Sequence, residues 1–446
     1  MTDAMEFECD VVVIGAGMAG LTVASRLAKC GASVVVLEKS TEIGGTARGS
    51  GGYVWTLPDA QIMSRQAASG DPKLQHVIFE EFEALVDWMR ALGTQVEGPH
   101  AVMSGRGYHV DIIGYLDRCH RAIVSNGGNI LRNSRVQGLL TNAGGAVCGA
   151  VVVDDADEQV AIRASWIILA TGGFTADPGL TEEFIGRRDV PMRVRASKNN
   201  VGDGLVLARS VGATTATSSG FYGHMVGTSI PLDDLETMRT YGLYHSDHAL
   251  LLGRDGFRFV DESLGDHMSV QSDYFVTEGA AALVWDERIN RDVVTKPWIQ
   301  GSPGEDRFAI AREAGARTVK AANLDDLASG LDEWGFDGSR AAETVRKFNS
   351  DMESGGIPDP ERRHHRSPLA EPPYYVIEVS PAITFPYGGL RVDEHSRVLD
   401  ARGAPIGGLL AVGSDVGGIM GPDYTGGLCT AGSFAIRAAR TVAAGS

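Results

Sequence analysis

Residues 9–38 read CDVVVIGAGMAGLTVASRLAKCGASVVVLE, and this stretch decides the fold of the N-terminal part of the chain. An apolar run, Cys9 to Ile14, leads into the glycine turn Gly15-Ala-Gly-Met-Ala-Gly20 and then into a helical pattern of apolar residues. A second apolar run, Val34 to Leu37, ends at Glu38. Strand, glycine turn, helix and strand within about thirty residues are typical of the βαβ unit.

Each glycine of this turn has its own task in a dinucleotide site. Gly15 permits the tight turn, Gly17 lets the backbone approach a pyrophosphate, and Gly20 lets helix and strand pack closely. The helix N-terminus faces the phosphates. Glu38 is placed to accept hydrogen bonds from a ribose, and it disfavours a 2′-phosphate there. The alternative is a structural βαβ unit without a ligand, which the ordered presence of all four elements disfavours. The pattern alone does not separate FAD from NAD.

Length and composition limit the other possibilities. A chain of 446 residues exceeds what one hydrophobic core usually fills, so we expect two domains. The net charge of −17 argues against duplex nucleic acid or an anionic membrane as a partner. Five scattered cysteines without CxxC spacing indicate a reducing compartment. The first ten residues lack an apolar signal region, and no apolar stretch is long enough to span a bilayer. We therefore expect a cytoplasmic globular protein.

The order of the patterns predicts an interrupted domain. Regular βαβ spacing is lost after Ala213, and the polar, proline-rich stretch Glu353 to Pro373 is typical of a linker or surface loop. Short strands and glycine turns then resume. We predict a cofactor domain formed by residues 1–213 and 361–446, with a substrate-capping domain at residues 214–360.

A second glycine-rich loop, Gly44-Gly-Thr-Ala-Arg-Gly-Ser-Gly-Gly52, follows the ribose carboxylate. Five further motifs follow in order: Ala170-Thr-Gly-Gly-Phe174, Gly202-Asp-Gly204, Gly256-Phe-Arg-Phe-Val-Asp-Glu262, Gly388-Gly389-Leu390 and Gly408-Leu-Leu-Ala-Val-Gly-Ser-Asp-Val-Gly-Gly418. In these motifs the chain resembles the flavoprotein family that includes fumarate reductases, succinate dehydrogenases and 3-ketosteroid dehydrogenases. The resemblance covers nearly the whole chain. It implies FAD and an α/β fold, with a Rossmann-like, glutathione-reductase-type FAD-binding domain and an inserted α+β cap.

The resemblance also implies which residues hold the cofactor. The second glycine loop would run beside the pyrophosphate and flavin, Thr171-Gly172 would lie near the ADP, and Asp415 would contact the ribityl chain. Backbone N–H groups of Gly426 to Cys429 would face the pyrimidine edge and favour negative charge on the reduced ring. The predicted cofactor-binding residues are Gly15, Ala16, Gly17, Met18, Ala19, Gly20, Glu38, Lys39, Gly44, Gly45, Thr46, Ser50, Gly51, Gly52, Val136, Ala170, Thr171, Gly172, Asp203, Gly413, Asp415, Gly427, Leu428 and Cys429.

The motifs that the sequence lacks argue against several kinds of flavin reaction. The sequence has no pair of nearby cysteines for disulfide reduction, no second nucleotide fingerprint for NAD(P)H, and no CxxCH for a c-type haem. What remains is hydride exchange between flavin and a carbon–carbon bond. Abstracting a proton beside a carbonyl while hydride leaves the neighbouring carbon requires a base and a group that stabilises the oxyanion.

Departures from the family distinguish its branches. Fumarate reductases and succinate dehydrogenases hold a dicarboxylate with arginines and histidines. The matching positions here are Thr384, Phe385 and Tyr424, and the stretch Ser263 to His267 lacks the arginine expected after Glu262. A pocket without these cations would bury carboxylates unpaired. Fumarate or succinate chemistry is therefore disfavoured.

The tyrosines are similar to the ketosteroid-dehydrogenase side of the family, where phenols polarise a ketone and remove a proton. Those enzymes carry a tyrosine where this chain offers Asp266 and His267. The candidate base is one of these two or His224, which falls where several relatives keep a substrate-facing histidine. Tyr387 and Tyr424 are candidate donors to the carbonyl oxygen. The alternatives are a helix cap for Asp266, a solvated His267, and core packing for the tyrosines.

We predict a dehydrogenase that introduces a C=C bond next to the carbonyl of a small-molecule substrate, a cyclic ketone or keto-acid. It would act by proton abstraction and hydride transfer to flavin N5, with an external electron acceptor. The same-fold alternative is an ene-reductase of an α,β-unsaturated carbonyl or carboxylate. The alternative of another class is a non-catalytic, flavin-bound electron-transfer subunit.

No metal site is predicted. The pair His364-His365 in the basic loop Arg362 to Arg366 lacks a carboxylate or cysteine at ligand spacing, which indicates a solvated loop. His245 and His248 are interpreted equally well as cap-lining or as surface residues.

Overall fold

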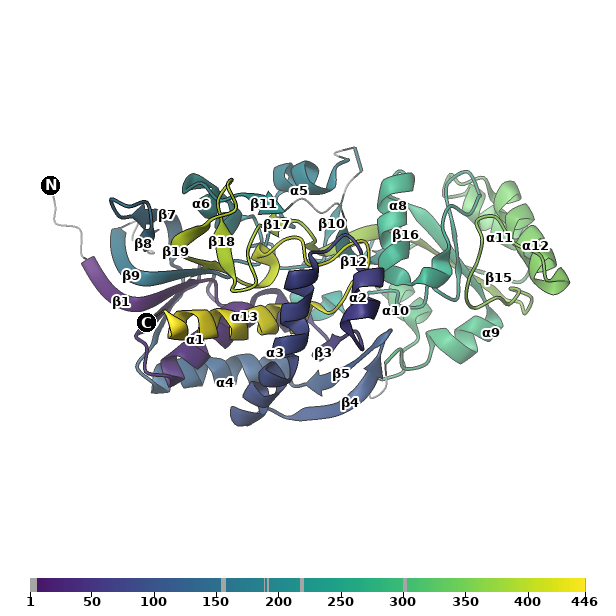
Figure 1. Ribbon diagram of the computed structural model, residues 1–446. Helices are drawn as coiled ribbons and strands as arrows, with labels where there is room; N and C mark the ends of the chain where they lie inside the picture. Colours follow the sequence, from purple (N-terminus) through teal and green to yellow (C-terminus); the bar gives the residue numbers. More distant parts are fainter. Residues whose placement is uncertain are drawn as a thin grey trace. The chain divides into compact units, whose positions relative to one another are not determined.

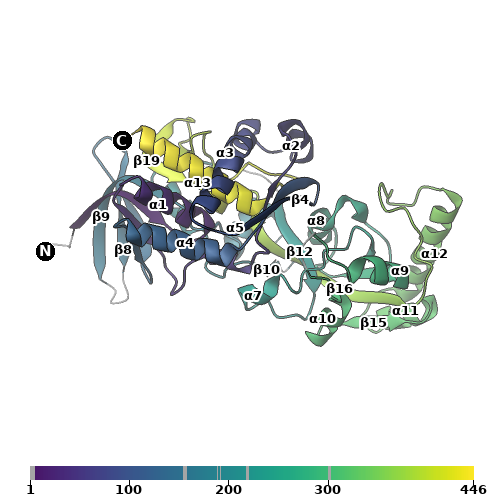
Figure 2. The ribbon, with the colours of Figure 1, turned by 90° about the horizontal axis from the view of Figure 1, so that it is seen from below.

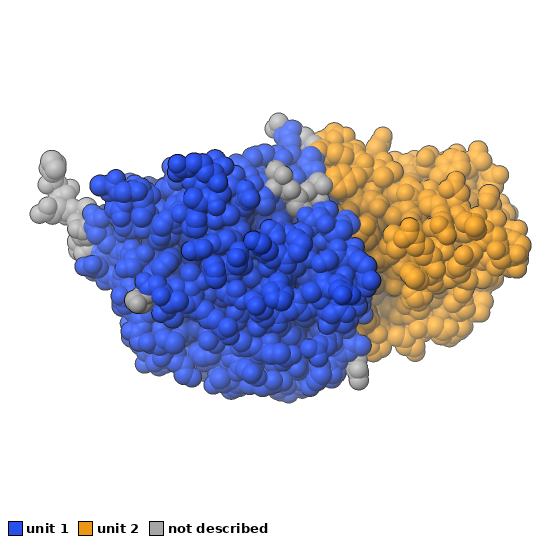
Figure 3. All heavy atoms as spheres, in the orientation of Figure 1, with its two compact units in different colours: residues 1–186, 196–221, 385–446 blue, residues 187–195, 222–384 orange. Residues whose placement is uncertain are grey.

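A computed structural model describes residues 6–153, 158–187, 189–190, 192–216, 220–299 and 303–445. The chain forms two compact units, which Figure 3 shows in different colours. Unit 1 comprises residues 1–186, 196–221 and 385–446, and unit 2 comprises residues 187–195 and 222–384.

The central sheet of unit 1 is built around β1 (Glu6–Ile14), the strand that precedes the glycine turn (Figure 1). β1 pairs in parallel with β2 (Val34–Leu37) on one side and with β9 (Gln159–Leu169) on the other. Beyond them lie β6 (Asn129–Leu131) and β19 (Pro405–Ala411), also parallel. The C-terminal part of the chain thus completes the sheet that the N-terminus begins, as the α/β prediction requires.

Helices and further, mostly antiparallel strands complete unit 1. α1 (Met18–Lys29) packs beside both α13 (Gly427–Ala444) and α4 (Ile112–Ser125), and α13 also contacts α3 (Pro72–Ala91) (Figure 2). The remaining strands are β3 (Tyr53–Thr56), β4 (Val96–Val102), β5 (Gly105–Val110), β7 (Arg135–Thr141), β8 (Val147–Val153), β11 (Thr215–Ala216), β17 (Gly389–Leu390) and β18 (Arg397–Leu399). The shorter helices are η1 (Gly45–Gly49), α2 (Ala60–Gln66), α5 (Pro178–Ile185), α6 (Asp203–Ser210) and η4 (Gly413–Asp415).

Unit 2 is an α+β body organised on the long strand β16 (Tyr374–Pro386), which pairs with four strands. These are β10 (Arg193–Val194), β12 (Phe221–Gly227), β14 (Ala281–Asp286) and β15 (Thr318–Ala321), and β14 also pairs with β13 (Leu250–Leu252). β14 is buried along its whole length, which is typical of a strand covered on both faces. The helical segments are α7 (Leu235–Met238), η2 (Glu262–Leu264), α8 (Asp266–Val276), α9 (Glu287–Ile289), η3 (Asn290–Val294), α10 (Arg307–Glu313), α11 (Leu324–Asp332) and α12 (Gly338–Ser354).

Unit 2 extends further along the chain than the predicted cap of residues 214–360. It extends as far as Thr384 because β16 pairs with β14 and β15, and this pairing keeps most of the strand in unit 2. Between α12 and β16, where every residue is described, no helix or strand forms, which matches the loop predicted from the composition. Among the described residues, no helix is both long and apolar enough to cross a bilayer.

Candidate functional site

The glycine turn is shaped by its own packing. Gly15 has φ +105°, and a Cβ at this position would lie 2.3 Å from the carbonyl oxygen of Ala170. A Cβ on Gly20 would lie 1.9 Å from the carbonyl oxygen of Gly15. Larger residues at either position would push β1, α1 and the end of β9 apart, so both glycines are required by sterics.

Gly17 differs because a Cβ there would meet nothing within 4 Å. Its backbone therefore faces open space at the point where α1 begins, and no side chain caps the helix. The first N–H groups of a helix lack intrahelical acceptors and attract anions. This combination fits a pyrophosphate.

Glu38 directly follows β2, and its side chain is held in place and only 9 % exposed. One carboxylate oxygen accepts a hydrogen bond from the backbone N–H of Ala16 (2.8 Å), and the other accepts bonds from the N–H and hydroxyl of Ser40 (both 2.9 Å). An ionised carboxylate has further lone pairs. Glu38 is therefore oriented to accept ribose hydroxyl groups beside the open face of the turn.

Four further predicted residues, Thr171, Asp415, Lys39 and Asp203, hold loops of unit 1 together. Asp415 is buried and accepts hydrogen bonds from the N–H (2.5 Å) and hydroxyl (2.8 Å) of Thr171 and from the N–H of Gly173 (3.1 Å). Burial raises its pKa, although these hydrogen bonds act in the opposite direction. Lys39 forms an ion pair with Asp203 at 2.5 Å. Asp415 thus shapes the loop that follows β9.

The start of α13 supplies backbone donors. Gly426 has φ +103°, and a Cβ there would lie 2.1 Å from the carbonyl oxygen of Trp55. The N–H of Gly427 donates to the hydroxyl of Tyr424 at 2.7 Å. Leu428 and Cys429 lie in the first turn, where N–H groups lack intrahelical acceptors. Burial raises the pKa of the Cys429 thiol to about 12, so this residue offers its backbone rather than a thiolate.

The other predicted cofactor residues also lie in unit 1. They are Met18 and Ala19 in the first turn of α1, Gly44 before η1, Gly45 and Thr46 in η1, Ser50, Gly51 and Gly52 after η1, Val136 in β7, Ala170 and Gly172 after β9, and Gly413 in η4. Together with the open turn and the fixed carboxylate, these residues fit FAD.

Unit 2 contains a chain of three polar side chains, of which two are buried and the third, Tyr222, is half-buried. His224 lies on β12 and Asp266 is the first residue of α8, and they are 5 % and 8 % exposed. Nδ1 of His224 is in close contact with a carboxylate oxygen of Asp266. Nε2 lies 2.8 Å from the hydroxyl oxygen of Tyr222. Tyr222 and His224 are two residues apart in a strand and therefore share a face.

The surroundings keep His224 neutral. Burial lowers its pKa, the Asp266 carboxylate raises it, and the charges of Arg195 and His267 lower it again. A neutral imidazole whose Nδ1–H donates to Asp266 presents Nε2 as an acceptor toward Tyr222. The three groups can therefore pass a proton along one line.

A buried cation and an aromatic pair lie beside this chain. Arg195 is 8 % exposed and donates to the hydroxyls of Tyr244 (3.0 Å) and Thr384 (3.1 Å) and to the carbonyl of Met238 (3.2 Å). The Tyr244 ring stacks on Trp298 with centroids 4.3 Å apart and meets His224 edge-on at 4.7 Å. Thr384 stands where the family resemblance implies a histidine, and its hydroxyl accepts a hydrogen bond from the Arg195 guanidinium.

The remaining predicted catalytic residues are His267, Tyr387 and Tyr424. His267 is 7 % exposed and its ring lies against Gly265, so it is not the solvated side chain considered as an alternative. Tyr387 and Tyr424 belong to unit 1, and both rings pack on Phe385. Among the described residues, the buried hydroxyl of Tyr387 has no hydrogen-bond partner. It therefore remains a candidate donor, while the Tyr424 hydroxyl accepts the Gly427 N–H.

Two residues of this cluster were not predicted. Tyr222 was detectable, because it stands two residues before His224 in a run typical of a strand. Arg195 carried no signal, since its position beside His224 depends on the pairing of β10 with β16.

Residues 10–429 match the model of the family described as "FAD binding domain". The chain belongs to this family. It is an FAD-dependent oxidoreductase acting on CH–CH bonds, and the predicted cofactor, fold class and family resemblance are confirmed.

Relatives in this FAD-binding family include reductases and dehydrogenases. The chain is 27 % identical to a fumarate reductase (cytochrome) of Shewanella frigidimarina, covering 94 % of this chain and 74 % of the relative. It is 24 % identical to 4-oxocyclohexanecarboxylate 2-dehydrogenase of Sinomonas cyclohexanicum, covering 97 % and 92 %. The structure of 3-ketosteroid-delta4-(5alpha)-dehydrogenase from Rhodococcus jostii RHA1 has the same fold, with a TM-score of 0.78, 20 % identity, and coverage of 99 % and 98 %.

The Glu38→Gln variant is expected to bind FAD about 10–100-fold more weakly, because it loses a charge-assisted hydrogen bond. Glutamine keeps one acceptor oxygen for the backbone of Ala16 or Ser40, so the turn should still form. The dissociation constant is measured by titrating flavin-free protein with FAD and following flavin fluorescence. Glu42→Gln, an exposed acid four residues later, is the matched control and should bind like the parent. Equal affinity in both variants would contradict the ribose assignment.

Proposed function

We propose that this flavoprotein desaturates a cyclic ketone or keto-acid, introducing a C=C bond beside the carbonyl. The observation that carries the proposal is the line of Tyr222, His224 and Asp266 in unit 2, in which the histidine and the aspartate are buried. A phenol, an imidazole and a carboxylate in contact form a base that works near neutral pH, as removal of a proton beside a carbonyl requires.

In the proposed reaction the Tyr222 oxygen takes the proton from the carbon next to the carbonyl. The hydroxyl proton of Tyr222 passes at the same time to Nε2 of His224, and the Asp266 carboxylate stabilises the imidazolium that forms. When bound, FAD supplies the acceptor for the hydride that leaves the neighbouring carbon. The substrate thus loses one proton and one hydride, and an external acceptor takes the two electrons to complete the cycle.

The neighbours of this line support a substrate with a ring and a polar end. The Tyr244–Trp298 stack offers an aromatic wall, and Arg195 is a buried cation suited to a carbonyl or carboxylate. In unit 1, Tyr387, whose hydroxyl is buried, remains the proposed donor to the ketone oxygen, where negative charge develops as the proton leaves. Similarity over nearly the full length of a 4-oxocyclohexanecarboxylate 2-dehydrogenase also supports a cyclic keto-acid.

The test is to mix the purified yellow protein, without oxygen, with 4-oxocyclohexanecarboxylate, cyclohexanone and cyclohexanecarboxylate in turn. We expect the ketones to bleach the absorbance of oxidised flavin and the last compound, which lacks a ketone, to leave it unchanged. In the Arg195→Met variant the concentration needed for half-maximal rate should rise about tenfold or more for the keto-acid, and little for cyclohexanone. A protein that no ketone bleaches would contradict the proposal.

An ene-reductase is the second candidate, because the relatives include a fumarate reductase with 27 % identity. The same three side chains would then donate a proton rather than accept one. Dithionite-reduced protein that is rapidly reoxidised by 2-cyclohexenone or fumarate, yet is not reduced by any ketone, would favour this direction. A flavin that neither substrate class reduces or reoxidises would favour the electron-transfer subunit.

A further inference from the structure

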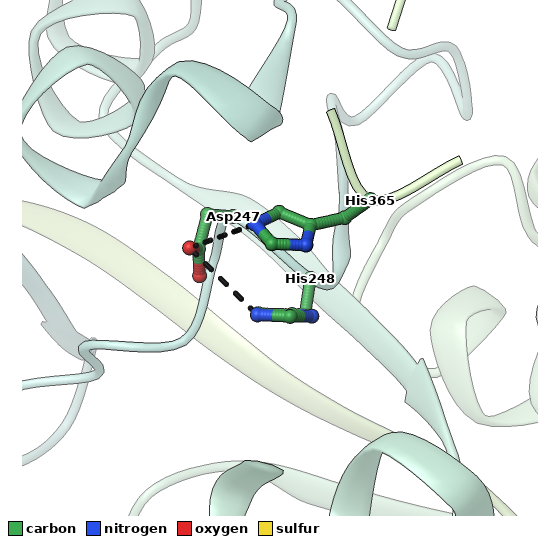
Figure 4. Close-up of side chains that lie close together, drawn as sticks. All are labelled: Asp247, His248 and His365. Carbon is green, nitrogen blue, oxygen red and sulfur yellow. Dashed lines mark ion pairs between the residues drawn. The ribbon is translucent and has the colours of Figure 1, made fainter. Parts of the chain in front are cut away.

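Three side chains from two loops of unit 2 converge outside the proposed catalytic line (Figure 4). They are Asp247, His248 and His365, and their ligand atoms all lie within 4.8 Å of one another. A carboxylate oxygen of Asp247 is 3.5 Å from Nε2 of His365 and 3.9 Å from Nε2 of His248. In the sequence, the only potential ligand adjacent to His365 is His364. The fold brings the carboxylate of Asp247 and the imidazole of His248 close to His365.

These separations are too long for hydrogen bonds. The Asp247–His365 separation matches the spacing between ligands in a tetrahedral zinc site, about 3.3–3.6 Å for metal–ligand bonds of about 2.0–2.2 Å, and the Asp247–His248 separation is longer at 3.9 Å. Two imidazole nitrogens and one carboxylate oxygen are also a ligand set that divalent transition metals accept, with water in the open position. The three ligand atoms are therefore close enough together for one ion to reach all of them.

Arg362 fixes the two loops that carry these residues. Its side chain is completely buried and donates to the backbone carbonyls of Asp247 (2.5 Å), Ala249 (2.9 Å) and His365 (3.1 Å). The same guanidinium is paired with the buried Glu262 carboxylate at 3.1 Å, which offsets its positive charge near an incoming cation. The loop predicted to be solvated is thus anchored by a buried arginine, and the ligand positions are set before an ion arrives.

An ion can reach this point from solvent. The side chains of Asp247, His248 and His365 are 31 %, 28 % and 39 % exposed. They are partly covered by the protein and still accessible, as an exchangeable metal site requires.

We propose that Asp247, His248 and His365 bind one divalent transition-metal ion, with Zn²⁺ as the reference ion. The ion would hold the loop that carries Asp247 and His248 against the loop at residues 362–366. The site lies within unit 2 and uses none of the residues of the reaction proposed above. A metal that binds only the folded chain stabilises it, so the expected role is structural.

The test uses the flavin-loaded protein after treatment with a chelator and removal of that chelator. We expect equilibrium dialysis against Zn²⁺, with metal analysis of the protein, to give one ion per chain, and Zn²⁺ to raise the midpoint of thermal unfolding. Co²⁺ should give an absorption band at wavelengths longer than those of oxidised flavin. The variants His365→Ala and Asp247→Asn should each bind Zn²⁺ at least about 100-fold more weakly, because a lost ligand costs no less than a lost second-shell partner.

His364→Ala is the matched control, since it removes the neighbouring histidine of the same loop and leaves the cluster intact. It should bind one ion with the affinity of the parent. The flavin-to-protein ratio of every variant confirms folding, and Asp247→Asn preserves side-chain size if a histidine variant proves unstable. The proposal fails if the parent binds no ion, or if His365→Ala and Asp247→Asn bind as tightly as His364→Ala.

Discussion

Replacing His224 with glutamine is expected to lower kcat for ketone desaturation by about 10²–10⁴-fold, the usual contribution of a positioned proton acceptor. The bound flavin should stay, because every predicted cofactor residue belongs to unit 1 whereas His224 lies in unit 2. The loss follows from the geometry. Nε2 of His224 lies 2.8 Å from the Tyr222 hydroxyl, so the substitution removes the imidazole nitrogen that is proposed to accept the phenol proton.

The Asp266→Asn variant separates a chemical role from a structural one through the pH profile. Burial lowers the pKa of His224, and the Asp266 carboxylate partly restores it. The imidazole is therefore neutral at pH 7, and kcat/KM of the parent should fall only at pH values below the ordinary histidine pKa of about 6.5. Without the carboxylate the pKa of His224 falls further, so the acid limb should move to lower pH while the maximal rate drops.

His245→Gln is the matched control for both variants. His245 is also buried in unit 2, at 5 % exposed, and its ring meets Trp285 edge-on at 4.9 Å. Burial lowers its pKa to about 3, so it is neutral like His224, but no carboxylate is bonded to it among the contacts of the described residues. We expect the parent rate and an unchanged pH profile. Equal losses in the His224 and His245 variants would indicate a packing defect instead of a proton relay.

The first βαβ unit was predictable because its causes are local. Gly15, Gly17 and Gly20 act through backbone space within one turn, and Glu38 is fixed by strand β2, which follows within the same stretch of sequence. The short chain distance leaves few alternative arrangements, so residue order alone is informative. The choice of FAD over NAD could be predicted only from the family resemblance of the later glycine motifs, since the turn by itself serves NAD equally well.

The proposed catalytic line of Tyr222, His224 and Asp266 was predicted only in part, because a contact between two residues in the fold does not follow from the separate motifs that contain them. His224 and Asp266 were both candidates, yet their contact depends on where α8 begins relative to β12. Arg195 is brought beside them by a two-residue strand that no pattern distinguishes. The basic loop at residues 362–366 is exposed at residues 363–366, as predicted, and departs from the prediction only at its first residue. Its polar composition indicated exposure, but Arg362 is buried because a carboxylate distant in sequence compensates its charge.

That carboxylate, Glu262, is the basis of the largest expected effect on stability. It is completely buried and accepts hydrogen bonds from Arg258 (2.6 and 3.0 Å), from Arg362 (3.1 Å) and from the backbone N–H of Leu251 (2.9 Å). Both guanidinium groups lie over the Phe348 ring, at 5.2 and 5.7 Å. A cation–π contact supplies only about 0.5–2 kcal/mol, so the carboxylate is what makes burial of two positive charges tolerable.

The Glu262→Gln variant is therefore expected to lower the free energy of unfolding by about 3–5 kcal/mol, the usual cost of removing one partner from a buried ion pair. The measurement is urea unfolding of the flavin-loaded protein, followed by tryptophan fluorescence, to which both units contribute three tryptophans each. Glu343→Gln is the matched control, because Glu343 forms a 2.6 Å pair with Arg340 at the surface and is 66 % exposed. Its loss should be below about 1 kcal/mol. If the two variants unfold at the same urea concentration, the buried arginines do not depend on Glu262, and water or other groups must compensate them.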